Sequence, residues 1–174
     1  MKISIKIYTF IIFLFLSTNA FAEQKIVIFD LKYALNNSKA GKGAQDFLKK
    51  SFETSSKKFA KMDEDLKKEE QDLLAKKTVL TNEDYSQKID ALRKKVIDYQ
   101  STRRKALEKI TSQRSESRAT LVKKITPILN TYIKENDISL VIDKTSSLGG
   151  NPDIDITEII IEKLNKELPS LNLK

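Results

Sequence analysis

The 174-residue sequence contains no cysteine, histidine or tryptophan, and only four glycines and three prolines. Because cysteine is absent, no disulfide can form, so helices, packing and association must stabilise the chain. Ser-His and Cys-His catalytic groups and zinc-histidine sites are excluded, and the few glycines form no phosphate-binding loop. The composition therefore argues against an enzyme, and it predicts no metal and no cofactor.

The N-terminal segment is organised like a secretory signal peptide. Two lysines precede an apolar run over 7–16, and Ala20 and Ala22 form a small-residue cleavage site. The run is too short for a membrane-spanning helix, which needs about 20 apolar residues. We therefore expect a signal peptide over 1–22, cleaved after Ala22, and a single mature domain over 23–174.

The expected mature chain is basic, with 30 Lys and Arg against 24 Asp and Glu, a net charge of +6. A basic protein can bind nucleic acid. Export argues against that partner, and no aromatic residues are interleaved with the basic ones as a platform for bases. Anionic lipid surfaces and acidic proteins are the expected partners instead.

A long region rich in helix-forming residues fills the middle of the chain, since residues 44–126 include neither glycine nor proline. Its first half has apolar residues every seven positions, at Phe52, Phe59, Leu66, Leu73 and Leu80. In its second half the apolar spacing alternates between four and three, with one arginine inside the series: Tyr85, Ile89, Leu92, Val96, Tyr99, Arg103, Ala106 and Ile110. Both patterns are typical of coiled-coil seams.

Between the two halves lies a helix start. Thr81 is a good N-cap with Asp84 three positions later, and Leu80 and Tyr85 occupy the positions of a hydrophobic staple. A new helix should begin at about Asn82. A short turn between two facing seams predicts an antiparallel hairpin arm over 45–124, roughly 55 Å long.

The seam loses its phase below the arm. Residues Gln113, Ser117 and Thr120 are polar where apolar residues are due, and the stripe restarts at Leu121 on a shifted face. This pattern predicts that the second helix leaves its partner there and meets a different core. Pro127, just inside the restart, predicts a kink and a hinge for the arm.

Two strand-like segments flank the arm, KIVIFD over 25–30 and ISLVID over 138–143. A hairpin brings its two ends together, so these strands can pair at its base. We expect a helical turn over 31–35 and a loop over 36–41. Asn136 and Asp137 are expected to end the long helix.

The C-terminal part should hold a turn-rich segment over 144–152, with a weak third strand, and a last helix. Asp155 and Glu158 form an Asp-x-x-Glu capping box, and the helix should run to about Leu168 with Ile156, Ile160 and Leu164 on one face.

The predicted fold class is α+β and mostly α, with a helical arm on a small β body over 23–44 and 125–174. So small a sheet is marginal alone, and association of the bodies would complete it. The residues expected in the associating body are Ile26, Ile28, Leu140, Val141 and Ile142.

The signal peptide, KIVIFD, the helical hairpin and ISLVID followed by DIDITEIIIEKLNK resemble the Skp (OmpH) family of periplasmic chaperones. The resemblance covers essentially the whole mature chain. It implies a periplasmic homotrimer with a shared β-barrel body and three helical arms. It also implies that unfolded outer-membrane proteins are held between the arms without ATP.

The family is also associated with lipopolysaccharide binding through basic arm residues. This chain departs from that pattern, because Thr102, Ser112 and Gln113 stand where basic residues are expected. Binding of lipopolysaccharide or of an anionic membrane surface is therefore left open.

Residues 93–124 hold 11 basic and three acidic residues, a net charge of +8. Each single charge is expected to lie on a solvated helix face, but together they would focus positive potential on a client. The candidate client-binding residues are Arg93, Lys94, Lys95, Arg103, Arg104, Lys105, Lys109, Arg114 and Arg118. The acidic clusters at 63–65 and 153–155 are interpreted as structural.

The preferred hypothesis is a holdase chaperone. The alternative is a structural coiled-coil adaptor that binds an anionic envelope surface through its basic arms.

Overall fold

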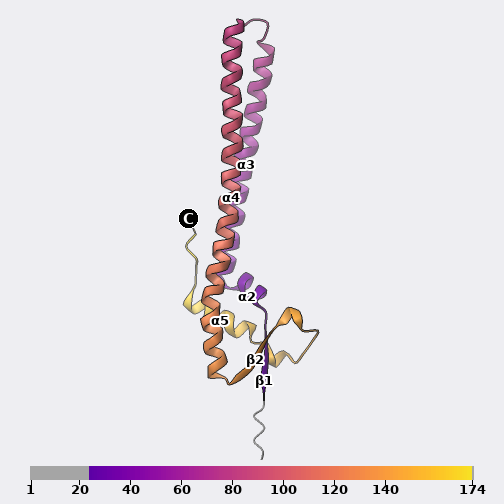
Figure 1. Ribbon diagram of the computed structural model, residues 1–174, viewed down its shortest axis with the longest axis vertical. Helices are drawn as coiled ribbons and strands as arrows, with labels where there is room; N and C mark the ends of the chain where they lie inside the picture. Colours follow the sequence, from indigo (N-terminus) through magenta and orange to yellow (C-terminus); the bar gives the residue numbers. More distant parts are fainter. Residues whose placement is uncertain (1–23, 174) are drawn as a thin grey trace, which may run out of the picture.

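A computed structural model describes residues 24–173, so the predicted signal peptide lies outside the described residues. The chain forms a long two-helix arm that stands on a small body (Figure 1). Within the described part, no helix is long and apolar enough to cross a membrane. The elements are β1 (Lys25–Phe29), α2 (Leu31–Asn37), α3 (Lys39–Ala75), α4 (Asn82–Glu135), β2 (Ile138–Asp143) and α5 (Thr157–Glu167), with the 3₁₀ turns η1 (Lys144–Ser146) and η2 (Pro152–Ile154) before α5.

The arm is the predicted antiparallel hairpin of α3, with 37 residues, and α4, with 54. The turn between them ends where the sequence indicates. Thr81 is the N-cap of α4, and its Oγ1 accepts a hydrogen bond from the backbone N–H of Asp84 at 3.1 Å. The helix ends at Glu135, with Asn136 as C-cap and Asp137 in the left-handed region at φ 50°. Both predicted boundaries of α4 are confirmed.

The junction at the foot of α3 differs from the predicted loop over 36–41, which is wrong. Helix α2 runs to Asn37, and only Ser38 separates it from α3. Ser38 is fully buried, and its Oγ accepts a hydrogen bond from the Gly41 N–H at 3.1 Å. An N-cap is a single non-helical residue, so Ser38 alone can separate the end of α2 from the start of α3.

Gly41 is required by a close approach at this junction. A Cβ on Gly41 would lie 1.9 Å from the carbonyl oxygen of Leu35 and 2.9 Å from Ser38 Oγ. The glycine therefore allows α2 and α3 to meet at a sharp angle. The sequence placed Gly41 in a predicted loop, whereas in the structure it is a helical residue that permits close packing.

The body contains the predicted pair of strands. Strands β1 and β2 are parallel, with Ile26 opposite Leu140 and Val27 opposite Val141. Val27 and Val141 face the chain's own helical core. On the opposite face, Ile26 is 40% exposed and Leu140 is 52% exposed. The sheet thus has one covered face and one face with exposed apolar side chains.

The segment between β2 and α5 forms two 3₁₀ turns, so the predicted third strand is wrong for these residues. Its one strand-like contact is an isolated bridge between Ile28 and Asp155. The predicted capping role of Asp155 is confirmed in part: Ile156, directly before α5, provides no side-chain hydrogen bond, but the Asp155 carboxylate accepts one from the N–H of Thr157, the first residue of α5, at 2.9 Å. The same carboxylate pairs with Lys144 Nζ at 2.6 Å.

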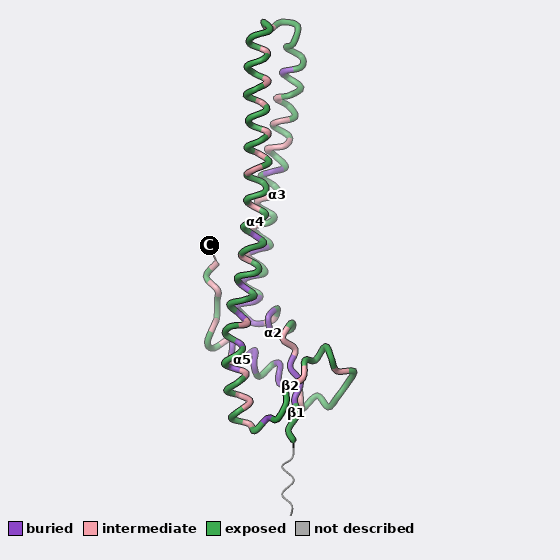
Figure 2. The backbone as a smooth tube through the Cα atoms, in the orientation of Figure 1, coloured by how far each residue is buried: buried purple, intermediate pink, exposed green. Residues whose placement is uncertain are grey.

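The core lies in the body, between β1, α2, the lower part of α4 and α5 (Figure 2). The predicted apolar face of α5 is confirmed. Ile156 is 4% exposed, and Ile160 and Leu164 are completely buried. Pro127 lies inside the continuous helix α4, between the core residues Ile125 and Ile128.

The stripe that restarts at Leu121 meets the core of the body, as predicted. The two helices of the arm nevertheless stay together below Ile110, so the predicted separation over 113–120 is wrong. Ser117 is 5% exposed, and it lines one groove together with Ala44 and Leu48 of α3. Its hydroxyl donates to the Gln113 carbonyl at 2.6 Å, which satisfies the buried polar group within α4. A buried serine therefore stands where the seam pattern called for an apolar residue.

Candidate functional site

The nine predicted client-binding residues all lie on α4, and all are exposed. They extend from Arg93 to Arg118, about 38 Å along the helix at 1.5 Å per residue. Consecutive residues of a helix point in different directions, so they form a basic surface around α4. They do not converge on one site.

Three of the nine are paired with acids. Arg93 Nη1 lies 3.1 Å from Asp90, Arg104 Nε lies 3.8 Å from Glu108, and Lys95 Nζ lies 2.6 Å from Glu69 on α3. The other six have no salt bridge to any residue within 24–173: Lys94, Arg103, Lys105, Lys109, Arg114 and Arg118. Exposed pairs contribute little to stability, but they reduce the charge left for a ligand.

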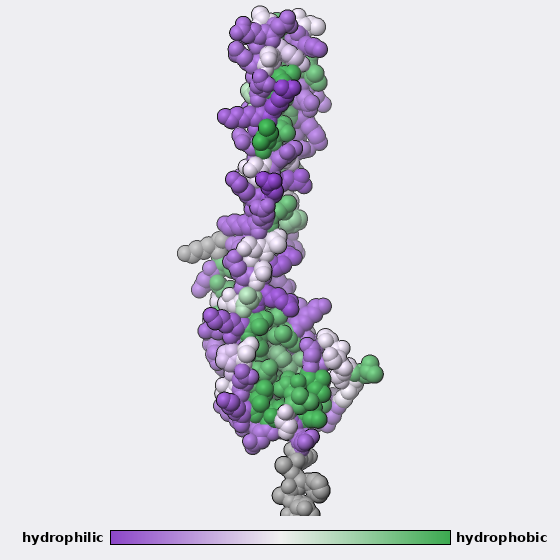
Figure 3. Space-filling view, viewed as in Figure 1, coloured by the Kyte–Doolittle hydropathy of each residue, from purple (hydrophilic) through white to green (hydrophobic). Residues whose placement is uncertain are grey.

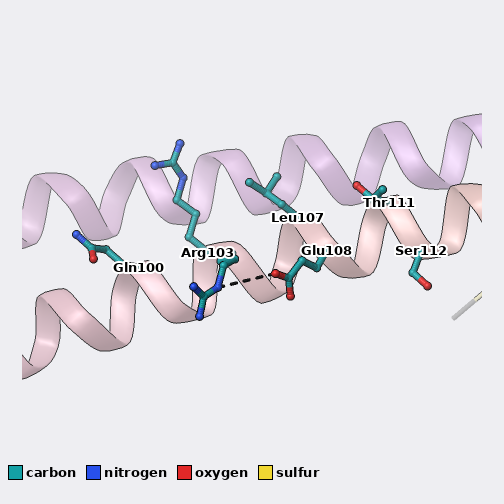
Figure 4. A pocket seen from close by; sticks show the side chains of 7 residues that line it. Gln100, Arg103, Leu107, Glu108, Thr111 and Ser112 are labelled. Atoms are coloured by element: carbon teal, nitrogen blue, oxygen red, sulfur yellow. Dashed lines mark ion pairs between the residues drawn. The ribbon is translucent and has the colours of Figure 1, made fainter.

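A shallow hollow of about 650 Å³ surrounds Arg103, the arginine that interrupts the apolar series. In Figure 4, Arg103 and Leu107 extend to the side of α4 that is drawn toward α3, and Glu108 and Ser112 extend to the other side. The dashed line marks the ion pair of Arg104 with Glu108. Leu107 is 41% exposed, so an apolar side chain lies beside cations here.

A second hollow, here called the distal groove, lies between α3 and α4 near the tip and has a volume of about 810 Å³. Its lining is mainly apolar, and green patches mark the upper arm in Figure 3. Leu74 and Ile97 in this groove are 58% and 64% exposed. Lys67 pairs with Asp63 at 2.7 Å, and this hydrogen bond and the charge of Asp63 raise the pKa of Lys67.

At the lower end of the distal groove, aromatic side chains pack across the seam. The rings of Phe59 and Tyr99 meet edge to face, with centroids 6.1 Å apart and an interplanar angle of 68°. Phe59 is 7% exposed, which confirms its predicted place in the seam. Such edge-to-face pairs are favourable beyond the area that they bury.

A third hollow of about 730 Å³, here called the basal groove, lies at the foot of the arm between α2, α3 and α4. It has an apolar floor and three cations at its edge. Its lining residues are Leu35, Asn36, Gly41, Ala44, Gln45, Asp46, Leu48, Lys49, Phe52, Arg114, Ser117, Arg118 and Leu121. Of these, only Arg114 and Arg118 belong to the predicted site.

Both acidic clusters contain a carboxylate that is paired with a lysine. In the described part of the chain, no three Asp or Glu residues are placed to hold a metal ion. Asp63 pairs with Lys67 and Asp155 with Lys144. Both carboxylates have structural partners, which agrees with the structural interpretation of these clusters.

The predicted body residues all lie in the two-stranded sheet. They divide between its faces, since Val141 packs on the chain's own core whereas Ile26 and Leu140 are exposed. The space-filling view shows a broad apolar area over the body (Figure 3). An apolar sheet face of this kind is suited to bury against another molecule.

A family model described as outer membrane protein (OmpH-like) matches residues 25–164, which include both strands, the arm and most of α5. The chain belongs to the OmpH-like family. Its fold is also similar to a crystal structure from Caulobacter crescentus, solved as "a putative outer membrane chaperone (OmpH-like)". That similarity has a TM-score of 0.80 at 19% identity and covers 91% of this chain and 94% of the other. No curated protein matches the chain.

Sequence reasoning missed the basal groove, because its residues come from three helices. Lys49 and Phe52 lie on α3, more than sixty positions before Arg114 in the sequence. From the sequence, Phe52 could be a seam residue or a client contact; its heptad position favoured the seam, yet half of it is exposed. One signal of this exposure was available in the sequence. Polar residues such as Ser55 occupy seam positions between the apolar ones, and an incomplete seam leaves apolar residues uncovered.

Proposed function

We propose that this chain is an ATP-independent holdase chaperone of the periplasm. It binds unfolded outer-membrane proteins and prevents their aggregation before membrane insertion. Membership of the OmpH-like family and the similarity to a structure described as an outer membrane chaperone support this proposal. The arm itself supports a binding role, because its two helices carry long open grooves.

The observation that carries the proposal is the combination of apolar and basic groups along one exposed arm. Leu74, Ile97, Leu107 and Phe52 are each 41% to 64% exposed and lie in hollows that also hold arginine or lysine. An unfolded outer-membrane protein offers apolar segments and commonly a net negative charge. Open grooves suit a chain without fixed shape better than an enclosed pocket does.

We further propose that three chains associate through their bodies and enclose the client between their arms. The exposed sheet face with Ile26 and Leu140 supports association, because an isolated two-stranded sheet is marginally stable. Three mature chains at +6 each would carry +18, which would attract acidic clients over a long range.

We also propose export to the periplasm with cleavage after Ala22. Mass spectrometry of the protein recovered from the periplasmic fraction should show a chain that begins at Glu23. A chain recovered with its N-terminal segment intact, or in the cytoplasmic fraction, would contradict the assigned location.

The chaperone function is tested by diluting a urea-unfolded outer-membrane β-barrel protein into buffer with the mature chain. Light scattering should stay low when the chain is present in a threefold molar excess, and it should rise when albumin replaces the chain. If the chain binds anionic vesicles but leaves the scattering unchanged, the structural adaptor hypothesis replaces the chaperone.

A further inference from the structure

The basal groove differs from the distal groove in how its charges are satisfied. In the distal groove, Lys67 and Arg93 are paired with acids. In the basal groove, Lys49, Arg114 and Arg118 have no salt bridge to any residue within 24–173. Three cations that line one hollow without a salt bridge favour a ligand that carries negative charge.

The floor between these cations is apolar. Leu35, Leu48 and Leu121 line it and are almost completely buried, while Phe52 is 50% exposed. About half of Phe52 is therefore accessible to a ligand. Aromatic side chains contribute large contact areas and are common at the centres of binding surfaces.

Two amide side chains lie at the α2 end of the groove. Gln45 Nε2 donates to Asn36 Oδ1 at 3.0 Å. The structure gives no further partner, within the described chain, to Asn36 Nδ2 or Gln45 Oε1. One donor and one acceptor are thus available side by side, which is the pair that a peptide backbone requires.

We propose that the basal groove is the grip for an acidic, apolar segment of an unfolded polypeptide. Client carboxylates bind Lys49, Arg114 and Arg118, an apolar side chain packs on Phe52, and the amides bind its backbone. This assignment rests on the proposed chaperone function and gives it a location. Asp46, also in the lining, disfavours a compact polyanionic headgroup, whereas a polypeptide can space its carboxylates so that they meet the cations and avoid Asp46.

The test uses the full mature chain and two fluorescent peptides. One carries glutamates around two phenylalanines, and in the other lysines replace the glutamates. The variants are Arg114→Glu with Arg118→Glu, and Phe52→Ser. We expect each to weaken binding of the acidic peptide by about tenfold or more, because charge-assisted hydrogen bonds and buried aromatic contacts are the strong terms.

Matched controls distinguish binding in the groove from the effect of net charge and from nonspecific hydrophobic binding. Lys57→Glu with Lys58→Glu makes the same charge change at two exposed lysines that line none of the three hollows described above. Leu148→Ser removes a fully exposed leucine in the loop before α5. Both should leave the affinity for the acidic peptide within about twofold of the unmodified chain at 0.5 M salt, where long-range attraction is screened.

Two outcomes overturn the assignment. Equal losses in the groove and control charge variants at high salt would mean that only net charge matters. If the groove variants lose binding to phosphatidylglycerol vesicles but keep peptide binding, the occupant is an anionic lipid. The aggregation assay distinguishes these results from a failure of the chaperone function, because that function fails only if the unmodified chain does not suppress aggregation.

Discussion

At the scale of single residues, Gly41 shows how one missing side chain fixes a helix junction. Changing Gly41 to alanine would place a Cβ 1.9 Å from the backbone oxygen of Leu35, which cannot move without displacing α2. We expect Gly41→Ala to lower the free energy of unfolding by about 2 kcal/mol or more, as overpacking against fixed atoms does. Urea unfolding followed by circular dichroism measures this change.

Gly43, two residues later in the same helix, is the matched control. No atom lies within 4 Å of the Cβ that alanine would add there. Gly43→Ala should stabilise the chain by about 0.5–1 kcal/mol, since alanine is the better helix former. If both variants shifted stability in the same direction, the steric account of Gly41 would be wrong.

Asp155 joins β1, the 144–155 segment and α5, and it makes stability depend on pH. Partial burial raises its pKa, but hydrogen bonds from Lys144 and Thr157 outweigh burial and leave the pKa of Asp155 below its ordinary value. A depressed pKa means that the stabilisation is present above the unfolded-state pKa and is lost as pH falls through the folded-state pKa.

We predict that the stability of Asp155→Asn depends less on pH in the acid range than that of the unmodified chain. Above about pH 5 the variant should have a lower urea midpoint than the unmodified chain, and the difference should shrink below about pH 4. Asp153→Asn is the control, because Asp153 has no salt bridge to any residue of the described chain. A difference that stayed constant with pH would exclude the ionised carboxylate as its cause.

At the scale of elements, helix α4 connects the arm to the body, and its packing bears on where the arm can bend. Leu121 and Ile125 precede Pro127, Ile128 follows it, and all three belong to one core. Bending at Pro127 would open that core. A bend above Leu121, where Ser117 is the buried residue of α4, would disturb less apolar packing.

The hinge at Pro127 stays a prediction, and spin labels can test it. The chain has no cysteine, so cysteines introduced at Lys109 in the arm and Lys166 in α5 would be labelled uniquely. We expect a broad distance distribution that remains equally broad in Pro127→Ala. A distribution that narrows in this variant would assign the hinge to the proline, and a narrow distribution in both would indicate a rigid arm.

At the scale of the whole molecule, an aspartate introduced on one face of the sheet should have a different effect from one introduced on the other face. Leu140 is half exposed, so Leu140→Asp should dissociate the assembly while each chain keeps its helices. Val141 packs on the internal core, so Val141→Asp buries a charge and should unfold the body. Light-scattering mass and circular dichroism separate these outcomes.

Ser139→Asp, at an exposed position of the same strand, serves as the control and should change neither measurement. A Leu140→Asp protein with the mass of the unmodified assembly would show that this face is not the interface.

The charge of the molecule should govern the speed of client capture. Replacing Arg103, Arg104 and Lys105 by glutamate changes a mature chain from +6 to zero, because each replacement removes two charges. Capture of a labelled unfolded outer-membrane protein, measured by stopped flow, should slow in this variant at low salt. At 0.5 M salt the two proteins should converge, because exposed charges are screened beyond a few ångströms. Equal rates at every salt concentration would remove the electrostatic part of the mechanism.

Features that depend on local chemistry could be predicted from the sequence. The start of α4 at Asn82, its end at Asn136 and Asp137, the buried face of α5 and the pairing of the two strands are all confirmed. The boundaries of α4 and the buried face of α5 depend on caps, turn residues or the spacing of apolar residues within a short segment. The strand pairing follows from the predicted hairpin, which brings its two ends together. The OmpH-like family was recognisable for the same reason, since its most specific residues form short continuous runs.

Only the tertiary structure decided features that depend on residues far apart in sequence. Gly41 is explained by the backbone of Leu35, and Ser117 is buried where α4 lies beside α3. The inward face of Val141 depends on the helices that cover the sheet. The basal groove likewise exists because three helices meet at one level. Periodicity describes one element at a time, so the surface formed between elements follows from how they pack.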